Sequence, residues 1–340
     1  MSAGKVTARH YEKIEGSENL RCLLCSHKCV IAPGKTGFCR SRRNISGALY
    51  TLNYGLASAV NIDPVEKKPL YHFMPASSIV SIGTNFCNFS CKFCQNYEIS
   101  QSRTPQVEID GPKLLALVKK TPECCGVAYT YNEPIIWYEF VQDTAGFIRD
   151  NSFKTVMVTN GDISAEAFAG LAGRIDAMNI DLKAFDREFY SRICSGSLES
   201  VCRMIETAYK AGIIVEVTNL LIPGLNDSDA MIFALTDFIA SVSTDIPLHF
   251  SRYHPAYLMN YPATPAASLY RAYDLAVKKL KYVYLGNITD CDKNSTYCPG
   301  CKKMVIKRKN YICEPIAINS KGECAYCGEK IYGNFYNCGN

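Results

Sequence analysis

The chain has 340 residues, of which 48% are hydrophobic, and its formal net charge at pH 7 is +5. This length allows one large α/β domain with small additions, and so modest a charge is no argument for a nucleic-acid partner. No run of about 18 apolar residues occurs, which predicts no membrane-spanning helix, and the polar stretch over residues 1–16 predicts no secretory signal. We therefore expect a cytoplasmic protein.

Cysteine is the outlier of the composition, with 18 residues. Disulfides are rare in a reducing compartment, so closely spaced cysteines indicate metal or catalytic sites instead. Most of these cysteines fall into three groups. Among the others, Cys194 in the string ICSGS is the one whose role, core or reactive, stays open.

The first group lies near the N-terminus, in the spacing C-x2-C-x3-C-x9-C. Its members are Cys22, Cys25, Cys29 and Cys39. The first pair has the spacing with which two thiolates bind one tetrahedral ion, and turns at Gly34 and Gly37 would bring the last cysteine back. Thiolates suit zinc, mononuclear iron and an auxiliary cluster alike, so the metal stays open.

The segment DPVEKKPLYHF over residues 63–73 is rich in charge. Its polar residues are Asp63, Glu66, Lys67, Lys68 and His72. By its pattern alone, this segment is a solvated turn.

The second cysteine group, within NFCNFSCKFCQNYEISQ over residues 85–101, has the spacing CxxxCxxC. Its members are Cys87, Cys91 and Cys94. Iron–sulfur clusters are usually held by four cysteines, so three ligands on a four-iron cube leave one iron open to a substrate or cofactor, as at catalytic metal sites. The alternative is a zinc knuckle or a set of reduced core cysteines.

From residue 79 onward, short apolar runs alternate with amphipathic stretches. The apolar runs predict strands over 79–84, 126–134, 155–162, 177–185, 213–224, 247–255 and 281–287. The amphipathic stretches predict helices over 111–120, 137–151, 164–173, 198–212, 228–242 and 265–280. Such alternation implies βαβ units and a parallel sheet. Because the strands are too few for a closed eightfold barrel, we expect an α/β fold with a partial (β/α)6, TIM-like barrel.

The composition changes again after residue 287, where the spacing C-x2-C-x22-C-x2-C occurs. Its members are Cys298, Cys301, Cys324 and Cys327. Two such pairs joined by a hairpin are typical of a zinc ribbon or a rubredoxin-like site, whose metal supplies much of the folding free energy. We expect an N-terminal four-cysteine segment over 1–76, a barrel over 77–287 and a C-terminal ribbon-like module over 288–340.

Polar residues follow the predicted strands at their C-terminal ends, where the active sites of barrels lie. They include Asn132, Glu133, Asn160, Asp181 and Lys183. Each alone is as well explained by a cap, a turn or an ion pair, but their occurrence at successive strand ends favours one shared site. His249, Arg252 and His254 follow the sixth strand, where they would face a substrate, although packing explains them equally well.

The CxxxCxxC spacing resembles that of the radical S-adenosylmethionine (SAM) superfamily. Together with CLLCSHKC…GKTGFC, DPVEKKPLYHF, YTYNEP, VTNG, IDLKAF and TYCPGC…CAYCG, it resembles the radical SAM component of the AmmeMemoRadiSam system over residues 20–333. In that family the charged segment 63–73 is a signature. The chain departs from the family at Ser26, where proline is common, and at Asn85-Phe86, where glycine is common.

The resemblance implies a [4Fe–4S] cluster on the CxxxCxxC thiols, with SAM on the open iron. It implies Asn132 and Glu133 as acceptors for the SAM amino group, and Asn160, Asp181 and Lys183 as contacts for its ribose and carboxylate. It also implies a one-electron donor of the flavodoxin or ferredoxin type, and Memo-like and AMMECR-like proteins as partners. Zinc or iron is expected at the two four-cysteine sites.

The leading hypothesis is an enzyme that cleaves SAM reductively to a 5′-deoxyadenosyl radical and abstracts hydrogen from a substrate that the sequence does not identify. A narrower alternative is activation of a glycyl-radical enzyme of the pyruvate formate-lyase type. An alternative of another class is a metal-stabilised module that binds nucleic acid or protein, for which the basic run over residues 302–311 is the best support.

Overall fold

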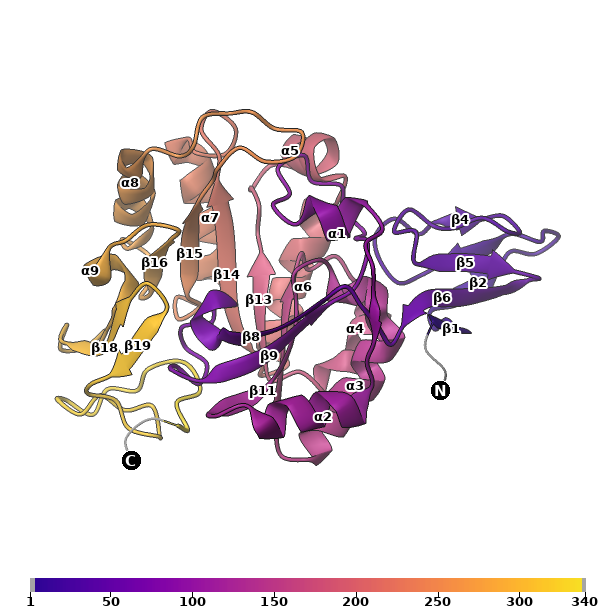
Figure 1. The fold of residues 1–340 in the computed structure, drawn as a ribbon. Helices are drawn as coiled ribbons and strands as arrows, with labels where there is room; N and C mark the ends of the chain where they lie inside the picture. The colour runs from indigo at the N-terminus through magenta and orange to yellow at the C-terminus, as the bar shows by residue number, and fades with distance from the viewer. Residues whose placement is uncertain (1–3, 338–340) are drawn as a thin grey trace.

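The centre of the molecule is an eight-stranded sheet with the strand order β16-β15-β14-β13-β12-β11-β9-β8 (Figure 1). The computed structural model describes residues 4–337. Strand β8 pairs antiparallel with β9, and the other neighbours pair parallel. The strands are β8 (Ala59–Pro64), β9 (Ser78–Gly83), β11 (Cys124–Tyr129), β12 (Lys154–Thr159), β13 (Ala177–Asp181), β14 (Ile214–Leu221), β15 (Leu248–Arg252) and β16 (Val283–Gly286).

Helices follow the parallel strands and cover the outer face of the curved sheet (Figure 1). The longer helices are α2 (Gly111–Lys120), α3 (Tyr138–Asp150), α4 (Ala165–Ala172), α6 (Leu198–Lys210), α7 (Asp229–Val242) and α8 (Ala266–Ala276). The side chains of Asp110, Ser164 and Ser197 cap α2, α4 and α6 by accepting backbone N–H groups of the first turn. None of the helices described between residues 4 and 337 is long and apolar enough to span a bilayer.

The predicted α/β fold with a partial barrel is confirmed. Each predicted strand has a counterpart among the seven parallel strands, whereas the antiparallel strand β8 was not predicted. Within the part of the chain that the structure describes, no ladder joins β8 to β16, so the barrel is open between these two edges.

Two small antiparallel sheets precede the barrel and lie beside α3 and α4 (Figure 1). One contains β1 (Gly4–Thr7), β6 (Ala48–Tyr54) and β5 (Arg42–Ile45), and the other contains β2 (Tyr11–Lys13), β3 (Leu20–Cys22) and β4 (Val30–Ile31). A third pair joins β7 (Leu56–Ala57) to β10 (Val107–Glu108). A buried ion pair ties this region to the barrel, because Arg42 Nη2 lies 2.5 Å from Glu139 Oε1 of α3.

The C-terminal module fills the open side of the barrel. Its sheet consists of β17 (Thr296–Tyr297), β18 (Met304–Lys309) and β19 (Ile312–Pro315) and lies next to β16 (Figure 1). Buried Arg308 donates from Nη2 to the Tyr71 carbonyl oxygen at 2.6 Å and from Nη1 to Thr296 Oγ1 at 2.7 Å. His72 Nδ1 lies 2.6 Å from the Tyr332 carbonyl oxygen. The module therefore contacts the segment after β8 as well as the opposite edge.

The segment after β8 also plugs the lumen of the barrel. Leu70 and Phe73 pack with inward-facing side chains of the sheet in an apolar cluster that is separate from the main core. Asn179 of β13 fixes the segment by donating from Nδ2 to the Pro69 carbonyl oxygen at 2.8 Å. The main core lies between the outer face of the sheet and the helices. The plug leaves the C-terminal ends of the strands for a site, as in barrel enzymes.

Candidate active site

The CxxxCxxC loop begins where β9 ends and is held in a strained conformation. Gly83 is required at this exit, since a Cβ there would lie 2.7 Å from the Thr130 carbonyl oxygen. Phe86 has a φ of 79°, in the left-handed region that favours glycine. The Arg40 guanidinium lies 4.5 Å from the centre of its ring. Strain in a bulky residue directly before Cys87 is typical of a functional site.

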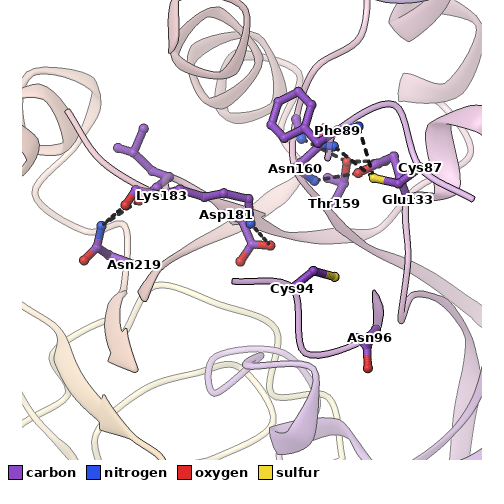
Figure 2. Close-up of polar contacts among 12 residues, drawn as sticks. Cys87, Phe89, Cys94, Asn96, Glu133, Thr159, Asn160, Asp181, Lys183 and Asn219 are labelled. Carbon is purple, nitrogen blue, oxygen red and sulfur yellow. Dashed lines mark hydrogen bonds and ion pairs between the residues drawn. The ribbon is translucent and has the colours of Figure 1, made fainter. Parts of the chain in front are cut away.

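A cavity of about 230 Å³ lies at the C-terminal ends of the strands. It is lined by Cys87, Cys91 and Cys94 and by all five predicted cofactor residues, Asn132, Glu133, Asn160, Asp181 and Lys183. The structure thus brings together residues from the loops after β9, β11, β12 and β13 (Figure 2).

Glu133 is fully buried against the end of β12. Its Oε1 accepts hydrogen bonds from Thr159 Oγ1 at 2.7 Å and Ile135 N at 3.0 Å, and its Oε2 accepts one from Asn160 N at 2.7 Å (Figure 2). Burial raises the pKa of Glu133 to about 7, although these hydrogen bonds oppose the shift. A cationic or hydrogen-bond-donating group placed in the cavity would strongly stabilise the ionised form of this buried carboxyl group.

Asn160 links Glu133 to the cysteine loop. Its Nδ2 donates to Asn88 Oδ1 at 2.8 Å and lies 3.8 Å from Cys87 Sγ. The same sulfur accepts a hydrogen bond from the Phe89 N–H at 3.3 Å. Hydrogen bonds to ligand sulfurs tune the reduction potential of an iron–sulfur cluster.

Asp181 and Lys183 form an ion pair on the other side of the cavity, with Nζ 3.0 Å from Oδ2 (Figure 2). Burial opposes the charge of Lys183, but Asp181 and then the thiols of Cys91 and Cys194 raise the pKa of this lysine well above its usual value. The cavity therefore holds the positive charge of Lys183 beside Asp181. The lysine is suited to a carboxylate of a ligand, and the aspartate is suited to its hydroxyl groups.

Asn132 lines the cavity, but both polar atoms of its side chain are already used. Its Oδ1 accepts from Thr84 N at 3.2 Å, and its Nδ2 donates to the Phe86 carbonyl oxygen at 2.6 Å. This side chain braces the start of the cysteine loop, a role that its position in the sequence could not distinguish from ligand binding.

The three loop thiols suit a cluster better than a single ion. Between residues 4 and 337, the C-terminal cysteines are the only group of three or more metal-ligating atoms within 4.8 Å of one another. The loop thiols are more widely spaced, yet they face one cavity. Cys94 Sγ lies 3.1 Å from Ser100 Oγ, and a hydrogen bond with Cys194 lowers the pKa of Cys91. Cys194 is therefore in contact with the cysteine loop.

A second cavity, of about 450 Å³, adjoins the first, and Ser251 and Asn287 line both. His249 and Arg252 line this second cavity, whereas His254 is exposed and lines neither. His249 Nε2 lies 2.7 Å from Oε2 of buried Glu216, a partner that the sequence analysis missed. A lone acidic residue inside the apolar strand β14 was the signal that could have found it.

The interpretation of the charged segment 63–73 as a solvated turn is wrong, because Asp63, Glu66, Lys68 and His72 are all buried. Asp63 accepts from Lys67 at 2.8 Å, from Lys68 at 2.6 Å and from Tyr131 Oη at 2.6 Å. Tyr131 lies one residue before Asn132 and also has a positive φ, of 72°. The segment therefore supports the loop that carries the cavity-lining residues after β11.

The C-terminal cysteines have the geometry of a site for one ion. Cys298 Sγ lies 3.5 Å from Cys327 Sγ, and Cys301 Sγ lies 3.7 Å from Cys324 Sγ. A tetrahedral zinc ion with Zn–S bonds of about 2.3 Å places its sulfur ligands about 3.8 Å apart. The N-terminal cysteines Cys22, Cys25, Cys29 and Cys39 line a different cavity, which has largely apolar walls.

Three comparisons relate the chain to known proteins. Residues 81–235 match the family model of the radical SAM superfamily. An uncharacterized protein of Methanocaldococcus jannaschii is 42% identical over 333 residues, which cover 95% of this chain and 98% of that protein.

Among solved structures, a radical SAM methyltransferase from Sphaerobacter thermophilus has a TM-score of 0.52 at 12% identity, over 89% of this chain and 81% of that one. The structure of Streptococcus suis SuiB bound to precursor peptide SuiA has a TM-score of 0.50 at 15% identity, over 64% of this chain and 50% of that one. At these identities the likeness shows the shared fold. The family match, the open barrel and the cysteine loop at its rim agree, and the chain belongs to the radical SAM superfamily, whose enzymes use SAM and a [4Fe–4S] cluster.

Proposed function

We propose that this protein cleaves SAM reductively at a [4Fe–4S] cluster on Cys87, Cys91 and Cys94 and uses the 5′-deoxyadenosyl radical to abstract hydrogen from a substrate. The observation that carries the proposal is the cavity in which these three widely spaced thiols lie beside buried Glu133. The protein itself contributes binding, orientation and exclusion of side reactions.

The polar groups of the cavity match the polar groups of SAM. Glu133 accepts a hydrogen bond from the SAM amino group, Lys183 pairs with its carboxylate, and Asp181 accepts from the ribose hydroxyls. Asn160 holds Glu133 and the sulfur of Cys87 in register through its backbone N–H and its side chain. Asn132 acts indirectly, by bracing the loop.

The 450 Å³ cavity is the proposed substrate site, because it adjoins the SAM cavity and has the size of small-molecule sites. Arg252 donates a hydrogen bond from Nε to the Thr264 carbonyl oxygen at 2.8 Å. This bond orients the guanidinium to bind an anionic group of the substrate. His249, held by Glu216, places an imidazole in this cavity that can act as a general acid or base.

The test is anaerobic purification followed by iron, sulfide and 5′-deoxyadenosine analysis in the presence of SAM and dithionite. Cys91→Ala is expected to lose the four irons of this cluster and all SAM cleavage. Cys202→Ala, which removes a thiol on α6 away from the cavity, is the matched control and keeps both. A Cys91→Ala protein that still forms 5′-deoxyadenosine refutes the proposal.

We further propose that the protein is the radical SAM component of an AmmeMemoRadiSam system. The support is the signature segment, whose Asp63 is tied to the loop after β11 and whose His72 contacts the C-terminal module. Co-purification with the Memo-like and AMMECR-like proteins of the same organism tests it. Should the target instead be a glycyl-radical enzyme, a doublet would appear in the electron paramagnetic resonance (EPR) spectrum of that added enzyme.

The C-terminal module binds zinc in this proposal, and its role is structural. In the basic run, Arg308 is buried and used inside the molecule, while Lys302, Lys303, Lys307 and Lys309 are exposed. This distribution supports a solvated face better than a nucleic-acid site. Salt-dependent RNA binding without SAM turnover would decide for the binding-module alternative. The domains proposed are 1–76, 77–287 and 288–340, with β8 of the first segment contributing the edge strand of the barrel sheet.

A further inference from the structure

The proposed substrate cavity is built by three separate parts of the chain. The end of β15 provides Arg252, and the segment after β8 provides Lys67. The third part is the C-terminal module, which provides Asn310 and Tyr311. The module whose cysteines have the geometry of a metal site therefore also borders the space in which the substrate is proposed to bind.

Asn310 and Tyr311 form the turn of the β18–β19 hairpin. Lys309 pairs with Ile312, so the turn contains just these two residues. Asn310 has a φ of 54°, in the left-handed region that asparagine adopts more readily than most residues. Two-residue turns are held by the paired strands on either side of them. The position of Tyr311 is therefore set by the hairpin and not by a long loop.

The turn meets residues that follow both edge strands of the open barrel. On the side of β16, Thr289 Oγ1 donates to Asn310 Oδ1 at 3.4 Å. On the side of β8, Asp63 raises the pKa of Lys67 and Tyr311 adds to this shift, which places the phenol of Tyr311 near the ammonium group. The turn is thus fixed at the cavity from both sides.

The cavity carries positive charge that the protein does not neutralise. Among the residues that the structure describes, no carboxylate forms an ion pair with Arg252. Lys67 lies 2.8 Å from Asp63, but the same carboxylate also pairs with Lys68 at 2.6 Å. One carboxylate therefore faces two ammonium groups, and the Lys67 side chain is 47% exposed. An anionic group of a ligand would complete the charge balance.

The other lining residues provide space for a carbon skeleton. Glu66 is the acidic residue of the lining, but only 2% of it is exposed, and its Oε1 accepts a hydrogen bond from the Ala76 N–H at 2.9 Å. Leu285, Ile288 and Tyr71 add apolar surface. A cavity of about 450 Å³ with cationic groups and apolar walls suits a small organic anion.

We propose that the substrate is a small organic anion, a carboxylate or a phosphate ester, and that Tyr311 of the C-terminal module determines which anion is accepted. Arg252 and Lys67 bind the anionic group, and the carbon skeleton packs against the ring of Tyr311. The carbon that reacts lies toward Ser251 and Asn287, which line both this cavity and the SAM cavity. The proposal rests on the proposed function, because it names the substrate of the same site.

Formation of 5′-deoxyadenosine by the full-length, cluster-loaded protein tests the class of substrate. The assay contains SAM and dithionite, and the probe is an ultrafiltered small-molecule extract of the same organism. The extract should raise the rate, and the active compound should bind to an anion-exchange resin. Loss of the stimulation after phosphatase treatment identifies a phosphate ester, and its retention identifies a carboxylate.

Two negative outcomes are distinguishable. Protein that cleaves SAM, but is stimulated by no fraction, only by the macromolecular fraction or only by compounds that the resin does not bind, would refute the proposed substrate class alone. Protein that forms no 5′-deoxyadenosine under any of these conditions would refute the proposed function.

Variants of Tyr311 test the role of the turn. Tyr311→Ala should raise about tenfold the amount of extract needed for half-maximal stimulation, and Tyr311→Phe, which keeps the ring, should restore the wild-type value. Tyr336→Ala is the matched control, because this tyrosine of the same module is 77% exposed and does not line the cavity. A Tyr311→Ala protein that needs no more extract than Tyr336→Ala would overturn the role of Tyr311.

A variant of Arg252 tests the anion site independently of the turn. Arg252→Gln should raise the amount of extract needed for half-maximal stimulation by about tenfold to a hundredfold, the range of a hydrogen bond to a charged group. An unchanged requirement would show that no anionic group binds at this arginine.

Discussion

The carboxyl group of Glu133 offers the sharpest test of how the cavity binds SAM. The group is buried, accepts three hydrogen bonds and has a pKa raised to about 7 by burial. In the free protein it is therefore mostly protonated below pH 7 and mostly ionised above it. If the ionised form accepts the SAM amino group, SAM affinity falls as the pH falls through 7, since binding must first release that proton.

The size of the effect follows from the pKa. With a value of about 7, about nine-tenths of the carboxyl groups are ionised at pH 8 and about one-tenth at pH 6. This residue should therefore weaken SAM binding about tenfold between the two pH values. Glu133→Gln removes the charge, so binding at pH 8 should weaken by about tenfold to a hundredfold, the range of a hydrogen bond to a charged group.

The assay is equilibrium binding of SAM to the cluster-loaded, oxidised protein at pH 6, 7 and 8. The amino group of SAM itself titrates near pH 8, but wild type and Glu133→Gln see the same ligand, so the difference between their pH profiles isolates the carboxyl group. Glu98→Gln, an exposed substitution on α1 (Tyr97–Gln101), is the matched control. Parallel pH profiles for wild type and Glu133→Gln, with equal iron content, would show that this carboxyl group does not contact the amino group.

Three further outcomes are expected. Gly196→Ala should lower the free energy of unfolding in urea by about 1–3 kcal/mol, because a Cβ there would lie 2.2 Å from the ring of Phe89. The control Gly173→Ala meets nothing within 4 Å and should leave the stability unchanged. Equal urea midpoints for the two variants would contradict the packing. Burial lowers the pKa of His72 to about 4, so the folded state holds it neutral while the unfolded chain takes up a proton below its ordinary value of 6.5. The free energy of unfolding should fall by up to about 3 kcal/mol as the pH drops from about 6.5 toward 4. A His72→Asn protein whose stability declines equally steeply would show that His72 is not the cause. Removal of the C-terminal metal by a chelator should increase amide hydrogen exchange around His72, since Tyr332 of the module contacts it; unchanged exchange would show that the module holds its shape without metal.

The barrel was predictable because its signal is local. Strand β14 reads as an apolar run followed by polar residues, and the capping serines Ser164 and Ser228 mark the starts of α4 and α7. Strand β8 escaped prediction because it is an edge strand that leaves Ile62 58% exposed and so lacks the pattern of a buried run.

The roles of single side chains were less predictable, because they depend on partners far along the chain. Asn132 and Glu133 are neighbours with the same predicted role, yet the amide of the first is saturated by the loop while the second is buried and poised for a ligand. His249 is held by Glu216, 33 residues away. The short distances between the C-terminal thiols are likewise a property of the folded chain, which the spacing of cysteines in the sequence does not contain.

The contact between His72 and the C-terminal module joins two parts of the chain that are synthesised at different times. The two hydrogen-bonding residues, His72 and Tyr332, are 260 positions apart. At a synthesis rate of about 5–20 residues per second, the lumen plug emerges from the ribosome roughly 15–50 s before the residues that cap it. The edge strand β8 must therefore wait unsealed over this period, in which exposed strand edges invite association with other chains. A cell that makes this protein would profit from a chaperone, or from a pause in translation, that shields the open side until the last residues arrive.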